Sequence, residues 1–246
     1  MVREDVGFPS YVLTPRRGPL TRTVHYLHGG GYMAPIDAFH VLYATRLARA
    51  LGARVVLPDY PLAPEHTWRD SHDVLVEQTD RWAREPGGVV LAGDSAGGGL
   101  ALAVAQSLRD RGLAQATHLV MHAPWVDLTT STPETAAFAE RDPWLFLGKL
   151  HAYAGWWAGT PDDLARSEVS PGLGDLSGLP PGLVLYGTRD LLAPGCRLLR
   201  RRAAEAGWPM RAVEEPDLLH VYGLFPFVPE ARRAFREVVE FVGDAR

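Results

Sequence analysis

The stretch that most constrains the fold is residues 87–105, GGVVLAGDSAGGGLALAVA, in which an apolar run leads into a glycine-rich turn and an alanine-rich segment. Residues 89–92 form a short unbroken apolar run, which is typical of a strand covered on both faces in a parallel sheet. Ser95 follows in the sequence GDSAG, a G-x-S-x-G pattern. The stretch therefore predicts a buried strand, a sharp turn that displays the Ser95 hydroxyl, and a helix that begins there, an arrangement called a nucleophile elbow.

The same five residues also fit an ordinary glycine-rich turn or a helix N-cap, where serine is favoured. A second motif, His28-Gly29-Gly30-Gly31-Tyr32, favours the elbow, because it too follows a strand-like run, residues 23–27. Without a Cβ atom, glycine backbone can turn its N–H groups toward the serine. We therefore expect Gly29, Gly30 and Ala96 to form an oxyanion hole, whose donors stabilise a tetrahedral intermediate. His28 is expected to anchor this loop by hydrogen bonding.

Length and composition exclude several classes of protein. The 246 residues fit one domain, and the net charge of −4 argues against a nucleic-acid partner, which needs a concentrated basic face. The single cysteine, Cys196, excludes an intrachain disulfide. No leader pattern and no apolar stretch of about eighteen residues is found. The sequence also lacks metal-ligand spacings, a dinucleotide fingerprint and a P-loop. We expect a cytoplasmic protein without metal or cofactor that binds a small molecule.

The rest of the chain alternates between strand-like and helix-like segments. Strands are predicted at residues 23–27, 54–57, 119–121, 183–186 and near 210–213, and helices at 37–51, about 70–84, 95–111, about 194–206 and from Pro229 onward. In the last helix Phe235, Val238, Val239 and Val242 recur at helical spacing and are expected to be buried. This alternation predicts a mostly parallel sheet with helices on both faces and a ligand site at the carboxyl ends of the strands.

Two regions depart from the alternation. Residues 127–170 are rich in aromatic side chains, and we interpret them as a small helical cap insertion that covers the site. Tyr32, Trp144, Trp156 and Trp157 are candidates for lining the substrate pocket, although the tryptophans also fit the core of a cap helix. Residues 1–20 are weakly patterned; Tyr11-Val12-Leu13 fits an edge strand, and the region is expected to be a shortened N-terminal cap.

An exposed serine needs a base to take its proton and a carboxylate to orient that base. In this kind of sheet the chain order is serine, acid, histidine. Asp190 directly follows the predicted strand at 183–186, and His220 lies between the last predicted strand and the last helix. Asp175 and Asp217 are weaker rivals for the acid, and Asp190 itself also fits a helix N-cap. His118 and His122 compete as the base, but both precede Asp190.

Three motifs together resemble the hormone-sensitive-lipase-like family of α/β hydrolases: His28-Gly29-Gly30-Gly31, residues 59–65 (DYPLAPE) and residues 93–98 (GDSAGG). The resemblance implies an α/β-hydrolase fold and a serine carboxylesterase acting on short to medium acyl esters through an acyl-enzyme, with Ser95, Asp190 and His220 as the catalytic triad. Bacterial esterases and lactone hydrolases are the branch it is most similar to. The family commonly places a second acidic residue after the triad acid, whereas this chain continues Leu191-Leu192-Ala193-Pro194.

Two other functions remain open at this stage. An arylformamidase-type amide hydrolase would use the same triad on a flat aromatic substrate, which tryptophans could stack against. A non-catalytic ligand-binding protein on the same fold would be expected to lack a member of the triad, and all three are present. The sequence does not determine whether the chain forms a homodimer.

Overall fold

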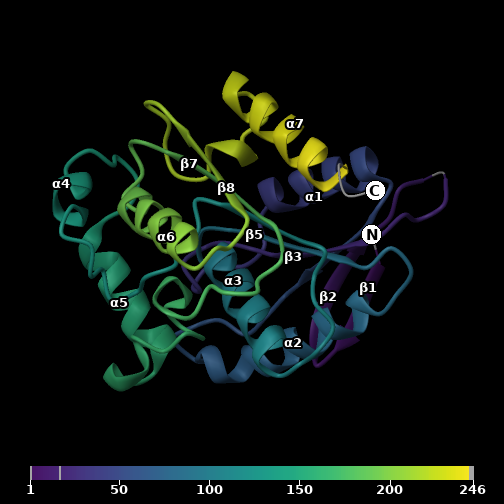
Figure 1. Ribbon diagram of the computed structural model, residues 1–246, viewed down its shortest axis with the longest axis horizontal. Helices are drawn as coiled ribbons and strands as arrows, with labels where there is room; N and C mark the ends of the chain where they lie inside the picture. Colours follow the sequence, from purple (N-terminus) through teal and green to yellow (C-terminus); the bar gives the residue numbers. More distant parts are fainter. Residues whose placement is uncertain (1, 17, 244–246) are drawn as a thin grey trace.

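The computed structural model describes residues 2–16 and 18–243, which form an eight-stranded sheet with helices on both faces (Figure 1). The strands lie in the order β1-β2-β4-β3-β5-β6-β7-β8. Their bounds are β1 Val2–Val6, β2 Phe8–Leu13, β3 Thr23–Leu27, β4 Arg54–Pro58, β5 Val89–Asp94, β6 His118–His122, β7 Gly182–Gly187 and β8 Met210–Glu215. Strands β3 to β8 are parallel, whereas β1 pairs antiparallel with β2, and β2 with β4.

The centre of the sheet is fully buried. Every residue of β3, β5, β6 and β7 lies in the interior, as the unbroken apolar runs predict for strands covered on both faces. In the register of the sheet Gly93 lies beside Leu27 on one side and Met121 on the other. The ends of β3 and β5, which carry the two glycine motifs, are therefore adjacent.

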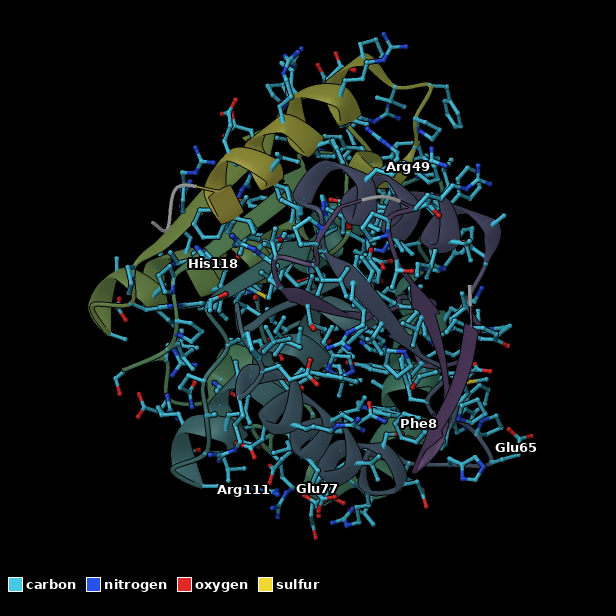
Figure 2. The ribbon with its side chains drawn as sticks, turned by 90° about the vertical axis from the view of Figure 1, so that its right-hand side faces the viewer. Phe8, Arg49, Glu65, Glu77, Arg111 and His118 are labelled. Atoms are coloured by element: carbon cyan, nitrogen blue, oxygen red, sulfur yellow. The ribbon has the colours of Figure 1, made fainter. Side chains whose placement is uncertain are left out.

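The N-terminal region differs from the prediction. Residues 2–13 form two strands of the sheet and not a cap, and β2 lies between β1 and β4, so Tyr11-Val12-Leu13 is not at the edge. Phe8, Ser10 and Val12 point toward the interior, and a polar residue at the middle position hides the apolar alternation from sequence analysis. Figure 2 shows these purple strands at the margin of the sheet, with Phe8 labelled.

Helices cover the two faces of the sheet. Helix α1 (Ala38–Leu51) and helix α7 (Pro229–Gly243) lie together on one face, and α2 (Trp68–Ala83) and α3 (Ser95–Asp110) lie on the other (Figure 1). Arg49 of α1 and Glu77 of α2 mark these opposite faces in Figure 2.

The ends of the helices follow local chemistry. Asp37 caps α1, accepting from the amides of Phe39 and His40, and Gly52 ends it with a left-handed φ of 61°. In α7, Val238 and Val242 are buried as predicted, whereas Phe235 and Val239 are only half-buried. Helix α6 (Ala193–Glu205) packs against β7 and β8.

The segment between β6 and β7 is irregular. It carries α4 (Thr135–Ala139), α5 (Leu147–Ala158) and two 3-10 turns, η1 (Pro161–Asp163) and η2 (Pro171–Leu173). Helices α4 and α5 lie at the left of Figure 1, beyond the ends of the strands. Within the described residues, no helix has the length and apolar character needed to cross a membrane.

Candidate active site

Ser95 stands on a strained turn between β5 and α3. Its φ of +51° lies in the left-handed region, which non-glycine residues seldom adopt. The turn is tight on both sides: a Cβ atom on Gly93 would lie 2.4 Å from the Gly97 carbonyl oxygen, and one on Gly97 would lie 2.1 Å from the Leu27 carbonyl oxygen. Only glycine fits at these two positions, which explains the G-x-S-x-G spacing in physical terms.

The structure brings Ser95, His220 and Asp190 together from three separate loops. His220 Nε2 lies 2.8 Å from Ser95 Oγ, and His220 Nδ1 lies 2.8 Å from Asp190 Oδ2. Asp190 follows β7 and His220 follows β8, so the parallel strands deliver both to the same edge of the sheet. The carboxylate selects the Nδ1–H tautomer of His220, which leaves Nε2 free to accept the serine proton.

The two ionisable partners are buried and depend on each other. Asp190 is fully buried and His220 nearly so. Burial lowers the pKa of His220, but the adjacent Asp190 carboxylate, together with those of Asp142 and Asp94, outweighs burial, and the pKa is raised overall. The other oxygen of Asp190, Oδ1, accepts the Leu192 amide at 2.8 Å, which sets the orientation of the carboxylate toward His220.

The prediction for Gly29 is wrong. Its amide donates to Asp94 Oδ1 at 3.1 Å, so it is not available to an oxyanion. Gly30 and Gly31 have φ values of +110° and +64° and line the cavity in front of Ser95. Among the described residues, none accepts a hydrogen bond from the amide of either glycine. The Ala96 amide lies in the first turn of α3 and has no intrahelical acceptor. The available donors are therefore those of Gly30, Gly31 and Ala96.

Sequence reasoning missed the role of Asp94, which it treated as the variable position of the elbow motif. This buried carboxylate accepts the Tyr26 hydroxyl at 2.8 Å and the Gly29 amide at 3.1 Å through Oδ1, and His40 Nε2 lies 3.4 Å from Oδ2. It ties the glycine loop directly to the elbow. The only signal in the sequence is a carboxylate at the end of a fully apolar strand, where it must find partners.

The His40–Asp94 pair is charged in character. Burial raises the pKa of Asp94, but His40, followed by the Tyr26 hydroxyl, outweighs burial and lowers it overall. Burial likewise lowers the pKa of His40, and Asp94 together with Asp37 raises it overall. Each group therefore favours the charged form of the other.

The other histidines and acids of the sequence analysis are not at the site. His28 anchors the loop as expected: Nδ1 lies 2.8 Å from the Gly29 carbonyl oxygen, and its ring stacks on Tyr60.

The rival bases and acids have other partners. His122 bonds to the Tyr43 hydroxyl at 2.7 Å, and His118 lies 3.1 Å from the Thr117 hydroxyl. Asp175 caps an exposed turn through the Ser177 amide, and Asp217 is exposed as well.

A cavity of about 540 Å³ opens in front of Ser95 and His220. Its walls are mainly apolar side chains from the glycine loop, α5 and the segment after His220, including Met33, Phe39, Leu145, Phe146, Leu150, Tyr153, Leu224 and Phe225. Among the charged groups on the wall are Asp37 and Lys149. Within residues 2–16 and 18–243, no three His, Cys, Asp or Glu side chains are grouped so as to hold a metal ion.

Only one of the four predicted pocket residues lines the cavity. Trp144 does, with its ring edge-on to His220 and the ring centroids 5.6 Å apart. Tyr32 and Trp157 are fully buried and stack face to face at 4.2 Å beneath it, so they belong to the core. Trp156 contacts Tyr153 from outside the cavity. Helical spacing cannot place all three tryptophans on one wall, because Trp156 and Trp157 are adjacent on α5 and point to different sides.

Comparisons with known proteins bear on the fold and the family of the chain. Residues 24–224 match a protein family described as alpha/beta hydrolase fold. An acetyl-hydrolase of Streptomyces hygroscopicus is 35% identical, over 91% of this chain and 76% of the relative, and a carboxylesterase of Mycobacterium tuberculosis is 30% identical, over 85% and 68%. A crystal structure of an esterase from the bacterial hormone-sensitive lipase family superposes with a TM-score of 0.89 at 31% identity, covering 98% of this chain and 82% of that one. The fold class predicted from the sequence is confirmed.

Proposed function

The chain belongs to the hormone-sensitive-lipase-like branch of the alpha/beta hydrolase family, and from that premise we propose that it is a serine carboxylesterase whose catalytic residues are Ser95, His220 and Asp190. The observation that carries the proposal is the pair of 2.8 Å contacts that link the Ser95 hydroxyl through His220 to the Asp190 carboxylate. Nucleophile, base and orienting acid are thereby within hydrogen-bond distance of one another beside an apolar cavity.

In the proposed reaction His220 Nε2 takes the proton of Ser95 as the hydroxyl oxygen attacks the ester carbonyl carbon. The amides of Gly30, Gly31 and Ala96 stabilise the oxyanion of the tetrahedral intermediate, and Gly31 replaces Gly29 in this proposal. The imidazolium then gives its proton to the departing alkoxide, which leaves as alcohol. Water attacks the acyl-enzyme with His220 again as base, and the carboxylic acid leaves.

We propose esters of short to medium acyl chains as the substrates. An apolar cavity of about 540 Å³ supports this size class. The names of two relatives, an acetyl-hydrolase and a carboxylesterase, support the same chemistry. Lactones are cyclic esters and would follow the same steps, with the alcohol still tethered to the acyl group.

The arylformamidase alternative loses part of its support, because only Trp144 of the three tryptophans reaches the cavity. The Trp144 ring lies edge-on to His220, and Trp125 also lines the cavity, so turnover of N-formylkynurenine is the direct test of this alternative. The non-catalytic alternative would leave the contacts among Ser95, His220 and Asp190 without a purpose.

The decisive experiment is to treat the protein with an organophosphonate and locate the label by peptide mass spectrometry. We expect label on Ser95 and turnover of a p-nitrophenyl acyl series with highest kcat/KM at short or medium length. Ser95→Ala should lose both label and turnover while it folds normally. Label elsewhere, or none on folded wild type, refutes the assignment. Turnover of N-formylkynurenine without ester turnover would favour the amide hydrolase.

A further inference from the structure

Asp142 is a buried carboxylate outside the catalytic triad, in the segment between α4 and α5. Its two oxygens accept three backbone amides. Oδ1 accepts from Trp144 at 2.8 Å and Leu145 at 2.9 Å, and Oδ2 accepts from Leu191 at 2.7 Å. No ion pair involving Asp142 is found among the described residues, so these amides compensate a charge taken out of water.

The two oxygens serve different parts of the site. Through Oδ1, Asp142 holds the turn that presents Trp144 to the cavity, where the indole lies edge-on to His220. Through Oδ2, it holds the amide of the residue that directly follows Asp190. Asp142 and Leu191 are 49 residues apart in the chain, so this bond joins the segment over the cavity to the loop that carries the acid.

The loop after β7 is held by two carboxylates in succession. The Leu191 amide binds Asp142 Oδ2, and the next amide, that of Leu192, binds Asp190 Oδ1. If Asp142 were lost, a buried Leu191 amide would have no acceptor, which is costly enough that the loop should shift to find one. Because Asp190 lies between this amide and His220, such a shift would displace the carboxylate that orients the base.

We propose that Asp142 is a positioning residue that locks the acid loop to the cavity wall, so that one carboxylate holds both the loop that carries Asp190 and the turn that presents Trp144. This inference rests on the proposed esterase function. It also explains how the loop is supported although the run Leu191-Leu192-Ala193-Pro194 after Asp190 carries no acidic side chain of its own. The support comes from a different segment of the chain.

Electrostatics add a second effect of the same residue. After burial, which lowers it, the pKa of His220 is raised by Asp190 and further by the carboxylates of Asp142 and Asp94. These three carboxylates, with the Ser95 hydroxyl and the Trp144 ring, are the groups that act on the imidazole. Removing the charge of Asp142 should therefore move the acidic limb of the pH–activity profile to lower pH.

The test compares Asp142→Asn, Asp142→Ala and Trp144→Ala, with Asp163→Asn as matched control. In Asp142→Asn the amide oxygen can still accept from Trp144 and Leu145, but its NH₂ group then faces the Leu191 donor. We expect kcat to fall about tenfold to a hundredfold with KM nearly unchanged, because misplacing a catalytic group by about 1 Å costs this much. Trp144→Ala should chiefly raise KM, and Asp142→Ala should change both.

Asp163 is the control because it is an equally buried carboxylate in the same inserted segment. It binds Arg69 and the Thr160 hydroxyl and makes no contact with the acid loop. Asp163→Asn should lower thermal stability but leave kcat, KM and the acidic limb unchanged. Rates are expressed per active serine, counted by phosphonate titration, so that unfolded protein does not count.

The possible outcomes distinguish a failure of the proposed function from a failure of the positioning role of Asp142. Wild type without turnover or Ser95 label means that the proposed function fails. Active wild type with Asp142→Asn at the wild-type kcat and an unmoved acidic limb overturns the positioning role alone. If Asp142→Asn does not fold, Asp142→Glu takes its place: a folded protein with reduced kcat supports the role, and wild-type kcat overturns it.

Discussion

Two buried histidine–aspartate pairs flank Ser95, and they differ in what they can reach. In the His220–Asp190 pair the imidazole Nδ1 lies 2.8 Å from the carboxylate, and its Nε2 lies 2.8 Å from the Ser95 hydroxyl. In the His40–Asp94 pair the Nε2 atom itself faces the carboxylate at 3.4 Å, and Nδ1 faces Asp37, 3.0 Å from its amide nitrogen and 2.9 Å from its Oδ1. The second imidazole has no ring nitrogen left for the serine.

The difference shows that burial, charge and a raised histidine pKa do not define a catalytic base. Both histidines have a raised pKa, because nearby carboxylates together outweigh burial in each case. What separates them is which ring nitrogen points at the nucleophile. The His40–Asp94 pair instead fixes the Gly29 amide, and so positions the next two glycines in front of Ser95.

The largest expected effect comes from replacing the histidine of each pair. His220→Ala should lower kcat/KM for p-nitrophenyl acetate by about ten thousandfold or more, because the proton of Ser95 then has no acceptor. His40→Ala should cost less than about tenfold, since it acts only through the loop. Steady-state kinetics on protein with native circular dichroism tests both. Equal losses in the two variants would contradict the division of roles.

The next largest effect comes from replacing the aspartate of each pair, Asp190 or Asp94, by asparagine. Asp190→Asn should reduce kcat by roughly a thousandfold to ten thousandfold, because an amide can hold the wrong tautomer of His220 and cannot stabilise the imidazolium. Asp94→Asn should cost only about fivefold or less, because its carbonyl oxygen can still accept from Tyr26 and Gly29. Asp94→Ala, which removes that acceptor, serves as the control and should be clearly worse than Asp94→Asn.

A smaller effect is on the pH dependence of stability, where histidines without a carboxylate partner should behave differently from His220 and His40. Among the described residues, no carboxylate contacts four of the buried histidines, and burial, the largest cause, lowers the pKa of each to about 4; they are His25, His28, His72 and His122. Below pH 6.5 these histidines become protonated in the unfolded chain but stay neutral in the folded protein. The free energy of unfolding therefore falls as the pH is lowered. Each of these histidines should lower the free energy of unfolding by about 2 kcal/mol when the pH falls from 7.5 to 5.

Urea denaturation at the two pH values tests this prediction. The His72 ring bonds to the Ser107 hydroxyl, and among the described residues no carboxylate contacts it. His72→Gln should therefore reduce the pH dependence of the free energy of unfolding by the contribution of one histidine. The opposite sign holds for His220 and His40: their raised pKa contributes stability that is present below pH 6.5 and is lost as the pH rises through the folded-state value. An unchanged slope in His72→Gln would count against the assignment.

The smallest expected effect is on the pH–activity profile. Neutral His220 is the base, and its pKa is raised, so kcat/KM should fall on the acid side with a midpoint above the ordinary histidine value of about 6.5. His40→Gln should leave that midpoint in place, because His40 does not transfer the proton. A midpoint that moves with His40→Gln would show that the two pairs titrate as one unit.

Much of the fold and of the site could be predicted from local patterns. Short apolar runs predicted β5, β6 and β7, a strand-like run predicted β3, and the ends of β5 and β7 located Ser95 and Asp190. His220 followed from chain order, and the structure brings it to Ser95. Strand β1 was not predicted, and β2 was predicted only in part, as an edge strand at residues 11–13, because Ser10 interrupts the apolar alternation of β2 at an inward position.

The errors at the site have a common cause: a sequence pattern does not show which way a backbone amide or a side chain points. The motif His28-Gly29-Gly30-Gly31 shows that amides gather before Ser95, but it does not show that the Gly29 amide turns back to Asp94. Adjacent tryptophans look equivalent in the sequence, yet Trp157 enters the core against Tyr32 and Trp156 faces outward. Which way a donor or a ring points depends on neighbours that are distant in the chain.

The sequence by itself determined the order of strands and helices, the strained serine turn and the identity of the three residues that meet there, because these follow from periodicity, glycine sterics and strand ends. Only the tertiary structure decided which glycine amides face the cavity, which aromatic rings line it and how Asp142 holds the loop beside Asp190. Those are properties of contacts between segments far apart in the chain, and close packing selects them only when the whole sheet and its insertion are assembled.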